Sequence, residues 1–203
     1  MSSFAFMHPV VAFKCPSLDI LKFKDRVYDF WDKKVTDRYQ DTDIVDGTKI
    51  TNPQEDPILK EEIDKLVKES IVPAVNTYVI AIATENVDGD PPIAKLHVGN
   101  VWVNVLHPGA HQPNHVHGNS HLTGVFYLQS SKDSGRIHLS NPHLTGIEPL
   151  FHTSNIMRSL DNEIGNGWLW ASNLPHHLDI NRSDHDQISI GFTVHIDSVY
   201  GDG

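Results

Sequence analysis

The feature that most constrains the fold is a series of short β-rich segments in the second half of the chain. From Ile93 onward, apolar runs alternate with Gly, Pro, Asn and Asp, which favour turns. The candidate strands are IAKLHVG, VWVNVLH, HLTGVFYLQ, GRIHLS, NIMRSL, GWLWAS, HHLDI and QISIGFTVHI. Because no helical pattern interrupts them, a parallel sheet with crossover helices is disfavoured. The pattern predicts an antiparallel sandwich or barrel, a class that includes jelly rolls.

The first part of the chain has the spacing of helices instead. From Asp19 to about Tyr39, apolar residues recur at helical intervals. A second helix is expected in NPQEDPILKEEIDKLVKE, where Pro57 suits the first turn, and Pro73 should kink or end it. The next segment, AVNTYVIAIATEN, fits either a helix or a strand.

Length and charge narrow the possible architecture and partners. A chain of 203 residues with 39% hydrophobic residues can bury one sizeable core. We therefore expect one domain over residues 1–203, with a helical part at 1–92 packed on a β core at 93–203. The formal net charge of −10 argues against sequence-independent binding to nucleic acid or to an anionic membrane, because both need a basic surface.

Cysteine usage and hydropathy predict a cytoplasmic protein. The single cysteine, Cys15, cannot form an intrachain disulfide. The opening segment MSSFAFMHPVVAF lacks the basic start of a signal peptide. No apolar run approaches the ~18 residues that would span a bilayer. We expect no membrane partner, and the sequence leaves the oligomeric state open.

Histidines are the most unusual part of the composition, with fourteen in the chain. On a strand, His115 and His117 of NHVHGNSH would point to one face, roughly 7 Å apart at a rise of ~3.3 Å per residue. Histidine is the commonest metal ligand, and a facial metal site needs a third ligand from another strand. The segment NLPHHLDIN offers His176 and His177. The pattern predicts a metal site, and the alternative is a chance pair in a histidine-rich chain.

Three segments of the chain resemble the non-haem Fe(II), 2-oxoglutarate-dependent oxygenases: FAFMHPVVAFKCP, VWVNVLHPGAHQPNHVHGNSHLTGVFYLQ and GNGWLWASNLPHHLDINRSDHDQISIGF. They are most similar to a small subgroup from marine bacteria and phages with a His-x-His motif. The resemblance implies a mainly β fold, a double-stranded β-helix (a cupin-like jelly roll) with N-terminal helices packed on it. It also implies a dioxygenase that uses Fe(II), 2-oxoglutarate and molecular oxygen to oxidise a small molecule or a peptide.

The resemblance also implies the metal ligands. His115 takes the place of the first histidine of the family, and His117 stands where a carboxylate is usual. His176 fits the pattern of the distal histidine through SNLPHHL, so that His177 would point to the opposite face. An iron ion on His115, His117 and His176 would have a neutral ligand set, as three-histidine cupin sites have.

A second departure from the family concerns the co-substrate. The family usually holds the far carboxylate of 2-oxoglutarate with Arg or Lys near the start of the last strand, where this chain has Gln187. Glutamine cannot provide a charged, bidentate contact. We expect Arg136 in GRIHLS to supply the charge, with Asn104 and Tyr127 as polar partners. Arg182 is nearer to Gln187 in sequence but lies in an expected turn.

Three functions are compatible with these residues. The first is the 2-oxoglutarate-dependent oxygenase, which the ordered match along the β-rich half favours. The second is a cupin-like, three-histidine metal enzyme that does not use 2-oxoglutarate, and the third is a non-catalytic jelly-roll module whose histidines bind zinc or no metal. Gln187 favours the second or the third. The sequence does not reveal the substrate.

Overall fold

The computed structural model describes residues 8–34, 45–51, 53–83, 92–141 and 157–200. Its strands are β1 (Val10–Lys14), β2 (Val45–Thr51), β3 (Ile93–His115), β4 (Leu122–Gln129), β5 (Ile137–Ser140), β6 (Met157–Ser159), β7 (Asn166–Ala171), β8 (His176–Leu178) and β9 (Gln187–Tyr200). Its helices are α1 (Ile20–Lys34), α2 (Pro57–Leu66) and α3 (Val72–Ala83), with a short 3₁₀ helix, η1 (Pro53–Glu55), and a π-helical stretch, η2 (Val67–Ile71).

The strands form two sheets that share β3. The larger sheet has the order β1-β7-β4-β9-β3, with β2 on the far side of β3, and the smaller sheet continues from the end of β3 to β8, β5 and β6. All the strand pairs described are antiparallel. The predicted antiparallel β architecture is therefore confirmed.

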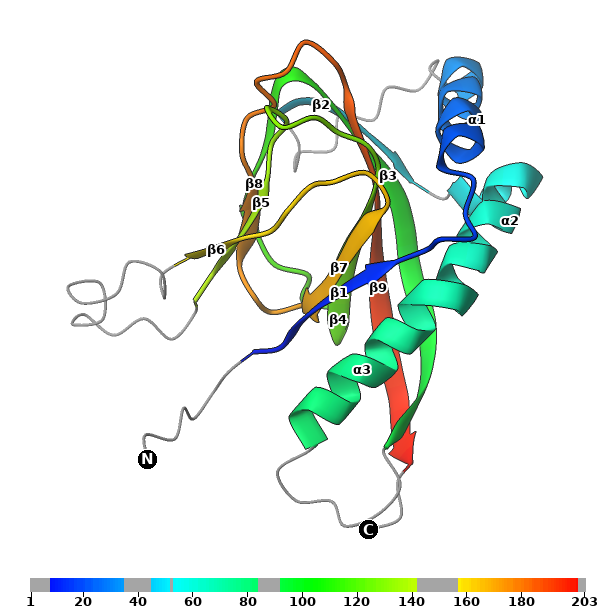
Figure 1. The fold of residues 1–203 in the computed structure, drawn as a ribbon, viewed down its shortest axis with the longest axis vertical. Coiled ribbons are helices and arrows are strands. Elements are labelled where there is room, and N and C mark those ends of the chain that lie inside the picture. Colours follow the sequence, from blue (N-terminus) through cyan, green and yellow to red (C-terminus); the bar gives the residue numbers. More distant parts are fainter. Residues whose placement is uncertain (1–7, 35–44, 52, 84–91, 142–156, 201–203) are drawn as a thin grey trace, which may run out of the picture.

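The larger sheet has an apolar cluster on each of its faces. On one face it packs against the three helices, which lie together on one side of the molecule (Figure 1). On the other face it packs against the smaller sheet through residues such as Leu106, Val125 and Leu178. Alternation along β3 produces this division, because Val103 faces the helices while its neighbour Asn104 faces the space between the sheets.

The second predicted helix is longer than expected. Of the two effects expected of Pro73, a kink or an end of the helix, the end is not observed, because Pro73 is the second residue of α3, which continues to Ala83. A π-helical stretch, in which the amide of Val72 donates to the carbonyl of Val67, ends at Ile71, two residues before the proline. The wider π-helical turn thus lies close to Pro73, which has no N–H to donate. The segment that the sequence left open between helix and strand is thus largely helical.

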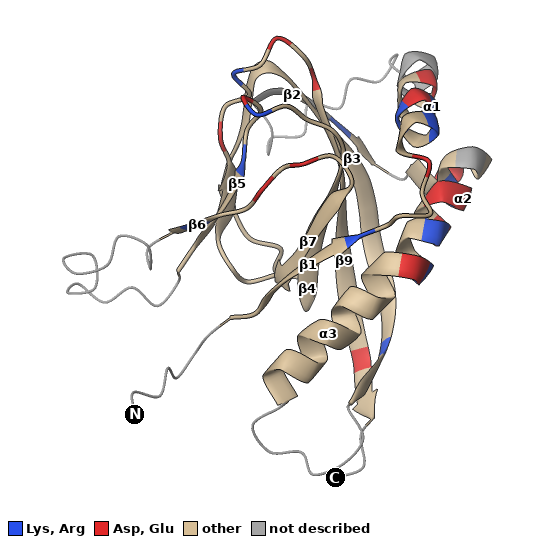
Figure 2. Ribbon diagram, in the orientation of Figure 1, with Lys and Arg blue, Asp and Glu red and all other residues tan. Residues whose placement is uncertain are grey.

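The helical run Leu59–Ala83 is long and apolar enough to cross a membrane, by length and composition alone. The core helix of a soluble protein has the same properties. Here Val75, Tyr78 and Val79 are buried in the cluster between helices and sheet. Figure 2 shows charged residues on α1 and α2, whereas α3 carries none. Packing against the larger sheet therefore accounts for the apolar character of α3.

Two boundaries differ from the sequence-based expectations. The part expected to be helical also contributes two strands, β1 and β2, which pair with the larger sheet. The first two expected strands of the β-rich half are one strand, β3, because its pairing with β9 passes the Gly99–Asn100 turn signal with a register shift between Val98 and Val101. The part of the first expected helix beyond Lys34 lies outside the described residues.

Candidate metal centre

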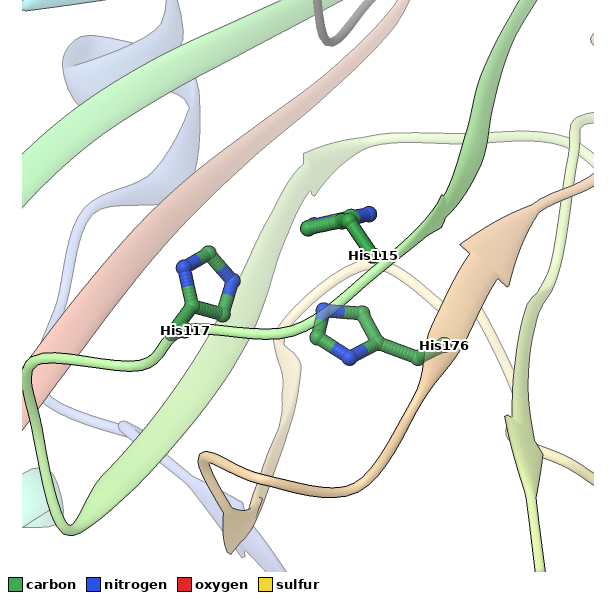
Figure 3. Close-up of side chains that lie close together, drawn as sticks. All are labelled: His115, His117 and His176. Atoms are coloured by element: carbon green, nitrogen blue, oxygen red, sulfur yellow. The ribbon is translucent and has the colours of Figure 1, made fainter. Parts of the chain in front are cut away.

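Three histidines from two parts of the chain converge between the sheets. His115 ends β3 and is paired directly with His176 of β8, while His117 follows in the loop toward β4. The ring centroids are 4.3 Å apart for His115 and His176, 5.1 Å for His115 and His117, and 5.2 Å for His117 and His176. One nitrogen from each ring lies within 4.8 Å of the other two. Figure 3 shows the three rings gathered around a common space.

Two of the rings are oriented by hydrogen bonds to backbone carbonyls. Nδ1 of His115 is 2.9 Å from the carbonyl oxygen of Pro113, and Nδ1 of His176 is 2.9 Å from that of Leu174. Because a carbonyl oxygen only accepts, Nδ1 must donate in both rings, and in the neutral form of each ring Nε2 keeps its lone pair. Histidines that bind metals are held in the same way by a partner of the second nitrogen.

The surroundings keep the third histidine neutral. His176 is only 3% exposed, and the ring of Trp170 lies 5.1 Å from its own in an edge-on arrangement. Burial and the proximity of His115 together lower the pKa of His176 to about 3, although the hydrogen bond to Leu174 opposes the shift. A neutral imidazole is the form that binds a metal ion. The structure therefore holds this ring in the metal-binding form.

The cluster contains the residues expected from the sequence. His115, His117 and His176 form one group of candidate donors, and no carboxylate of the described residues belongs to it. His177, the alternative third ligand, belongs to a different group with His138. The geometry thus favours His176, because adjacent residues of β8 point to opposite sides. That these three side chains bind iron stays a prediction.

A row of polar residues crosses the larger sheet on the face of the cluster. Asn104 of β3 is paired with Lys49 of β2 on one side and with Ser189 of β9 on the other, and Ser189 is paired with Tyr127 of β4. Directly paired residues point to the same face of a sheet. Asn104 and Ser189 line a cavity together with His115 and the other two histidines.

Two atoms of this row are buried without a hydrogen-bond partner among the described residues: Oδ1 of Asn104 and the hydroxyl of Tyr127. Nε1 of Trp170, which lines the same cavity, is also buried without a partner. Burial raises the pKa of Tyr127, so that its hydroxyl remains a proton donor. Buried polar groups are normally paired, and a polar ligand in the cavity would provide partners for Asn104 and Trp170. Tyr127 is not among the residues that line the cavity, and the roles of Asn104 and Tyr127 stay predictions.

The space around the histidines has two parts. The inner cavity is small, about 20 Å³. The outer cleft, which we define by Lys49, Thr51, Asn100, Val101, Trp102, His115, Val116, His117 and Thr193, has about 340 Å³. A volume of this order can take a small molecule.

Lys49 is the one Lys or Arg among the described residues that line the two spaces. Its Nζ lies 5.2 Å from the ring centroid of Trp102, which itself packs against His117. Lys49 was not predicted from the sequence, because it lies in TKIT, far from every motif. Its only signal is the alternation of polar and apolar residues that is typical of a strand.

The structure does not bring Arg136 to the site. Arg136 lies directly before β5, with 47% of its side chain exposed, and its guanidinium is 3.8 Å from the carboxylate of Asp161. Its neighbour Ile137 lines the inner cavity, whereas Arg136 does not. The expectation that Arg136 supplies a charge to the co-substrate therefore has no support in the geometry, because the side chain faces away.

Gln187 has a structural role at the position where the family usually has a cation. Its side chain is fully buried, and Nε2 donates to the carbonyl of Gly135 at 2.9 Å and to the hydroxyl of Ser130 at 3.3 Å. These contacts tie the start of β9 to the connection between β4 and β5. The amide therefore stabilises a turn, and its N–H groups are committed to that turn.

Comparison with known proteins agrees with this geometry. Residues 100–193 match the family model described as "Putative 2OG-Fe(II) oxygenase", a span that contains all three histidines. None of the curated protein sequences matches the chain.

Solved structures with the same fold are distant in sequence. The non-heme alpha ketoglutarate dependent carbocyclase SnoK from nogalamycin biosynthesis is 12% identical, with a TM-score of 0.64 over 95% of this chain and 81% of that one. AviO1 from Streptomyces viridochromogenes Tue57 is 13% identical, with a TM-score of 0.61 over 94% and 92%. The epimerase SnoN, solved with Fe3+, alpha ketoglutarate and nogalamycin RO, is 11% identical, with a TM-score of 0.58 over 95% and 80%.

These likenesses show the fold, which is the predicted double-stranded β-helix. The family match adds the sequence evidence for the segment that carries the histidines. Residues 100–193 therefore match the 2OG-Fe(II) oxygenase model in sequence, and the β core has the fold of such enzymes, which confirms the resemblance found in the sequence.

Proposed function

We propose that His115, His117 and His176 hold the iron of this oxygenase, and that its substrate is a small molecule bound in the outer cleft. The observation that carries the proposal is the convergence of three ring nitrogens within 4.8 Å at the place where the cleft begins. Around one ion with metal–nitrogen distances of ~2.1 Å, such nitrogens lie about 3 Å apart, so ring rotations would complete the site.

The bound iron would supply the oxidation of the substrate, with 2-oxoglutarate and oxygen as co-reactants. The residues of the chain position these groups and limit access of water. The backbone bonds of His115 and His176 fix the two rings, and the indoles of Trp102 and Trp170 pack against the histidines. This environment keeps the ligand nitrogens oriented before any ligand binds, as an efficient site requires.

For 2-oxoglutarate, we propose a set of polar partners that differs from the usual arginine. The hydroxyl of Tyr127 and Nε1 of Trp170 are buried donors without a partner among the described residues. Trp170 and Ser189 line the inner cavity, Tyr127 is paired with Ser189 in the sheet, and Lys49 contributes the positive charge from the outer cleft. Because an unpaired buried carboxylate costs several kcal/mol, several donors with one cation are needed. Lys49 thus replaces Arg136 in the expected role.

A cupin-like metal enzyme without 2-oxoglutarate is the second candidate. The neutral, three-histidine donor set favours it, and so does the use of Gln187 in a structural contact. Both candidates need the same three histidines for the metal. They differ in whether the iron-loaded chain binds 2-oxoglutarate.

The test is an anaerobic titration of the purified chain, first with Fe(II) and then with 2-oxoglutarate, followed by calorimetry. We expect one iron per chain at the three histidines, and 2-oxoglutarate binding that requires iron. Glutarate, which lacks the 2-oxo group, is the matched control and should bind more weakly. Succinate formed after oxygen is admitted would support the oxygenase, whereas iron binding without any 2-oxoglutarate binding would favour the cupin-like enzyme.

A further inference from the structure

A second group of metal-binding side chains lies on the other side of the smaller sheet. It consists of His138 in β5, His177 in β8 and Asp179 just after β8. We propose that these three residues, which we call the outer triad, bind a divalent transition metal ion. The inference is independent of the iron site, because it rests on different side chains with a different orientation.

The pairing of β5 with β8 positions the two histidines of the outer triad. His138 and His177 are paired directly across β5 and β8, and their rings stack with centroids 5.0 Å apart and an interplanar angle of 17°. The carboxylate of Asp179 reaches both rings: Oδ2 is 2.6 Å from Nε2 of His138, and Oδ1 is 3.7 Å from Nε2 of His177. One donor atom from each residue lies within 4.8 Å of the other two.

Small movements of the side chains would bring these distances to those found around a single ion. With metal–ligand distances of ~2.0–2.2 Å, neighbouring donors around an ion lie about 2.9–3.4 Å apart, and the two measured distances bracket this range. Nδ1 of His138 is buried, so Nε2 is the nitrogen that faces the carboxylate. A half-exposed carboxylate can move by the small amount that is needed, and the side chain of Asp179 is 53% exposed.

The donor types narrow the choice of ion. Two imidazoles and one carboxylate favour zinc, iron, nickel or copper over magnesium or calcium, which prefer oxygen ligands. The side chains of His138 and His177 are 14% and 29% exposed, so that an ion can reach the triad from solvent and keep water ligands. Such an ion would connect β5 to the end of β8, the strand that carries His176 on its other face.

The chain contains a matched control for this proposal. His97 and His195 also stack, with centroids 4.9 Å apart and an angle of 10°, and Nδ1 of His97 is 3.0 Å from the carboxylate of Asp197. Within the described part of the chain, however, the three donors of this set do not form a metal-binding group. Both sets therefore contain a contact between a histidine and an aspartate. Of the two, only the outer triad brings three donor atoms together.

The experiment uses zinc as the probe and the full chain with His115→Ala and His117→Ala, which removes the inner cluster. Zinc stoichiometry and affinity are measured by competition with a chromogenic chelator. We expect one zinc per chain in this background. Adding Asp179→Asn or His138→Gln should weaken zinc binding by at least tenfold, whereas adding His97→Gln should leave it unchanged.

Thermal unfolding gives a second readout, because an ion that binds only the folded chain raises the melting temperature. Zinc should raise it in the background chain and in the His97→Gln variant, but not with Asp179→Asn, a nearly isosteric change at a half-exposed position. No zinc binding in the background chain, or equal affinity with Asp179→Asn, would overturn the proposal. Loss of iron from His115→Ala in the otherwise native chain tests the inner site separately.

Discussion

The two faces of the larger sheet use alternate residues of the same strands for different purposes. The face toward the helices is apolar and buried, with residues such as Val103, Ile190 and Phe192. The opposite face carries Asn104 and Ser189 between them, in the wall of the cavity beside the histidines. The burial of apolar side chains on the first face stabilises the fold. The second tolerates buried polar atoms without partners, which is typical of a surface that binds a ligand.

Glycines make room for aromatic rings on both faces of the larger sheet. On the cavity face, a Cβ atom at Gly191 would lie 2.3 Å from the indole of Trp102. The missing side chain lets Trp102 lie across β9, where it packs against His117. On the helix-covered face, a Cβ atom at Gly124 would lie 2.4 Å from the ring of Phe192, so there the missing side chain makes room for a core residue instead of a residue of the site.

Among the substitutions that test this difference between the faces, we expect the largest effect from Phe192→Ala. Phe192 is fully buried in the helix-side cluster, so the substitution should lower the free energy of unfolding by about 3–5 kcal/mol. Ser189→Ala on the opposite face is the control and should lower it by less than about 1 kcal/mol. Urea unfolding measures both. Equal losses would contradict the division of roles between the two faces.

His115→Ala tests the cavity face, where we expect a substitution to affect iron binding and not the stability of the fold. Removing one of three ligands should weaken iron binding at least about 100-fold, or ~2.7 kcal/mol. The free energy of unfolding of the iron-free chain should change little, because His115 is only partly buried. Iron stoichiometry and urea unfolding are measured together. A variant that still binds one iron with unchanged affinity would show that the ligand assignment is wrong.

Lys49→Met tests whether Lys49, and not the expected arginine, supplies the positive charge to 2-oxoglutarate. Loss of a charged partner should weaken 2-oxoglutarate binding about tenfold, or ~1.4 kcal/mol, in anaerobic calorimetry of the iron-loaded chain. Arg136→Met is the control, and we expect no change, because Arg136 faces Asp161 away from the cavity. The reverse result would restore Arg136 and remove Lys49 from the site.

The smallest effect is expected from Tyr127→Phe. The hydroxyl is buried without a partner among the described residues, so its removal should leave the stability of the ligand-free chain within about 0.5 kcal/mol, or increase it slightly. Binding of 2-oxoglutarate should weaken by a factor of about 2–10 if the hydroxyl donates to it. Unchanged binding together with a large loss of stability would make Tyr127 a core residue only.

Local patterns in the sequence were sufficient for several features of this protein. The alternation of apolar and polar residues predicted the strands of the β-rich half, because successive side chains of a strand point to opposite faces. The same property put His176 and His177 on opposite sides of one strand, whereas His117 reaches His115 from the loop that follows β3. These features depend only on neighbouring residues, so the sequence by itself determined them.

Other features depend on which strands pair and in what register, and only the tertiary structure decided them. Pairing of β2 with β3 brings Lys49 opposite Asn104, although no motif links the two segments. Pairing of β5 with β8 places His138 beside His177, and the exposed position of Arg136 directs it to Asp161. Since such contacts join residues that are far apart along the chain, a local pattern carries no information about them, and the site was completed only by the fold.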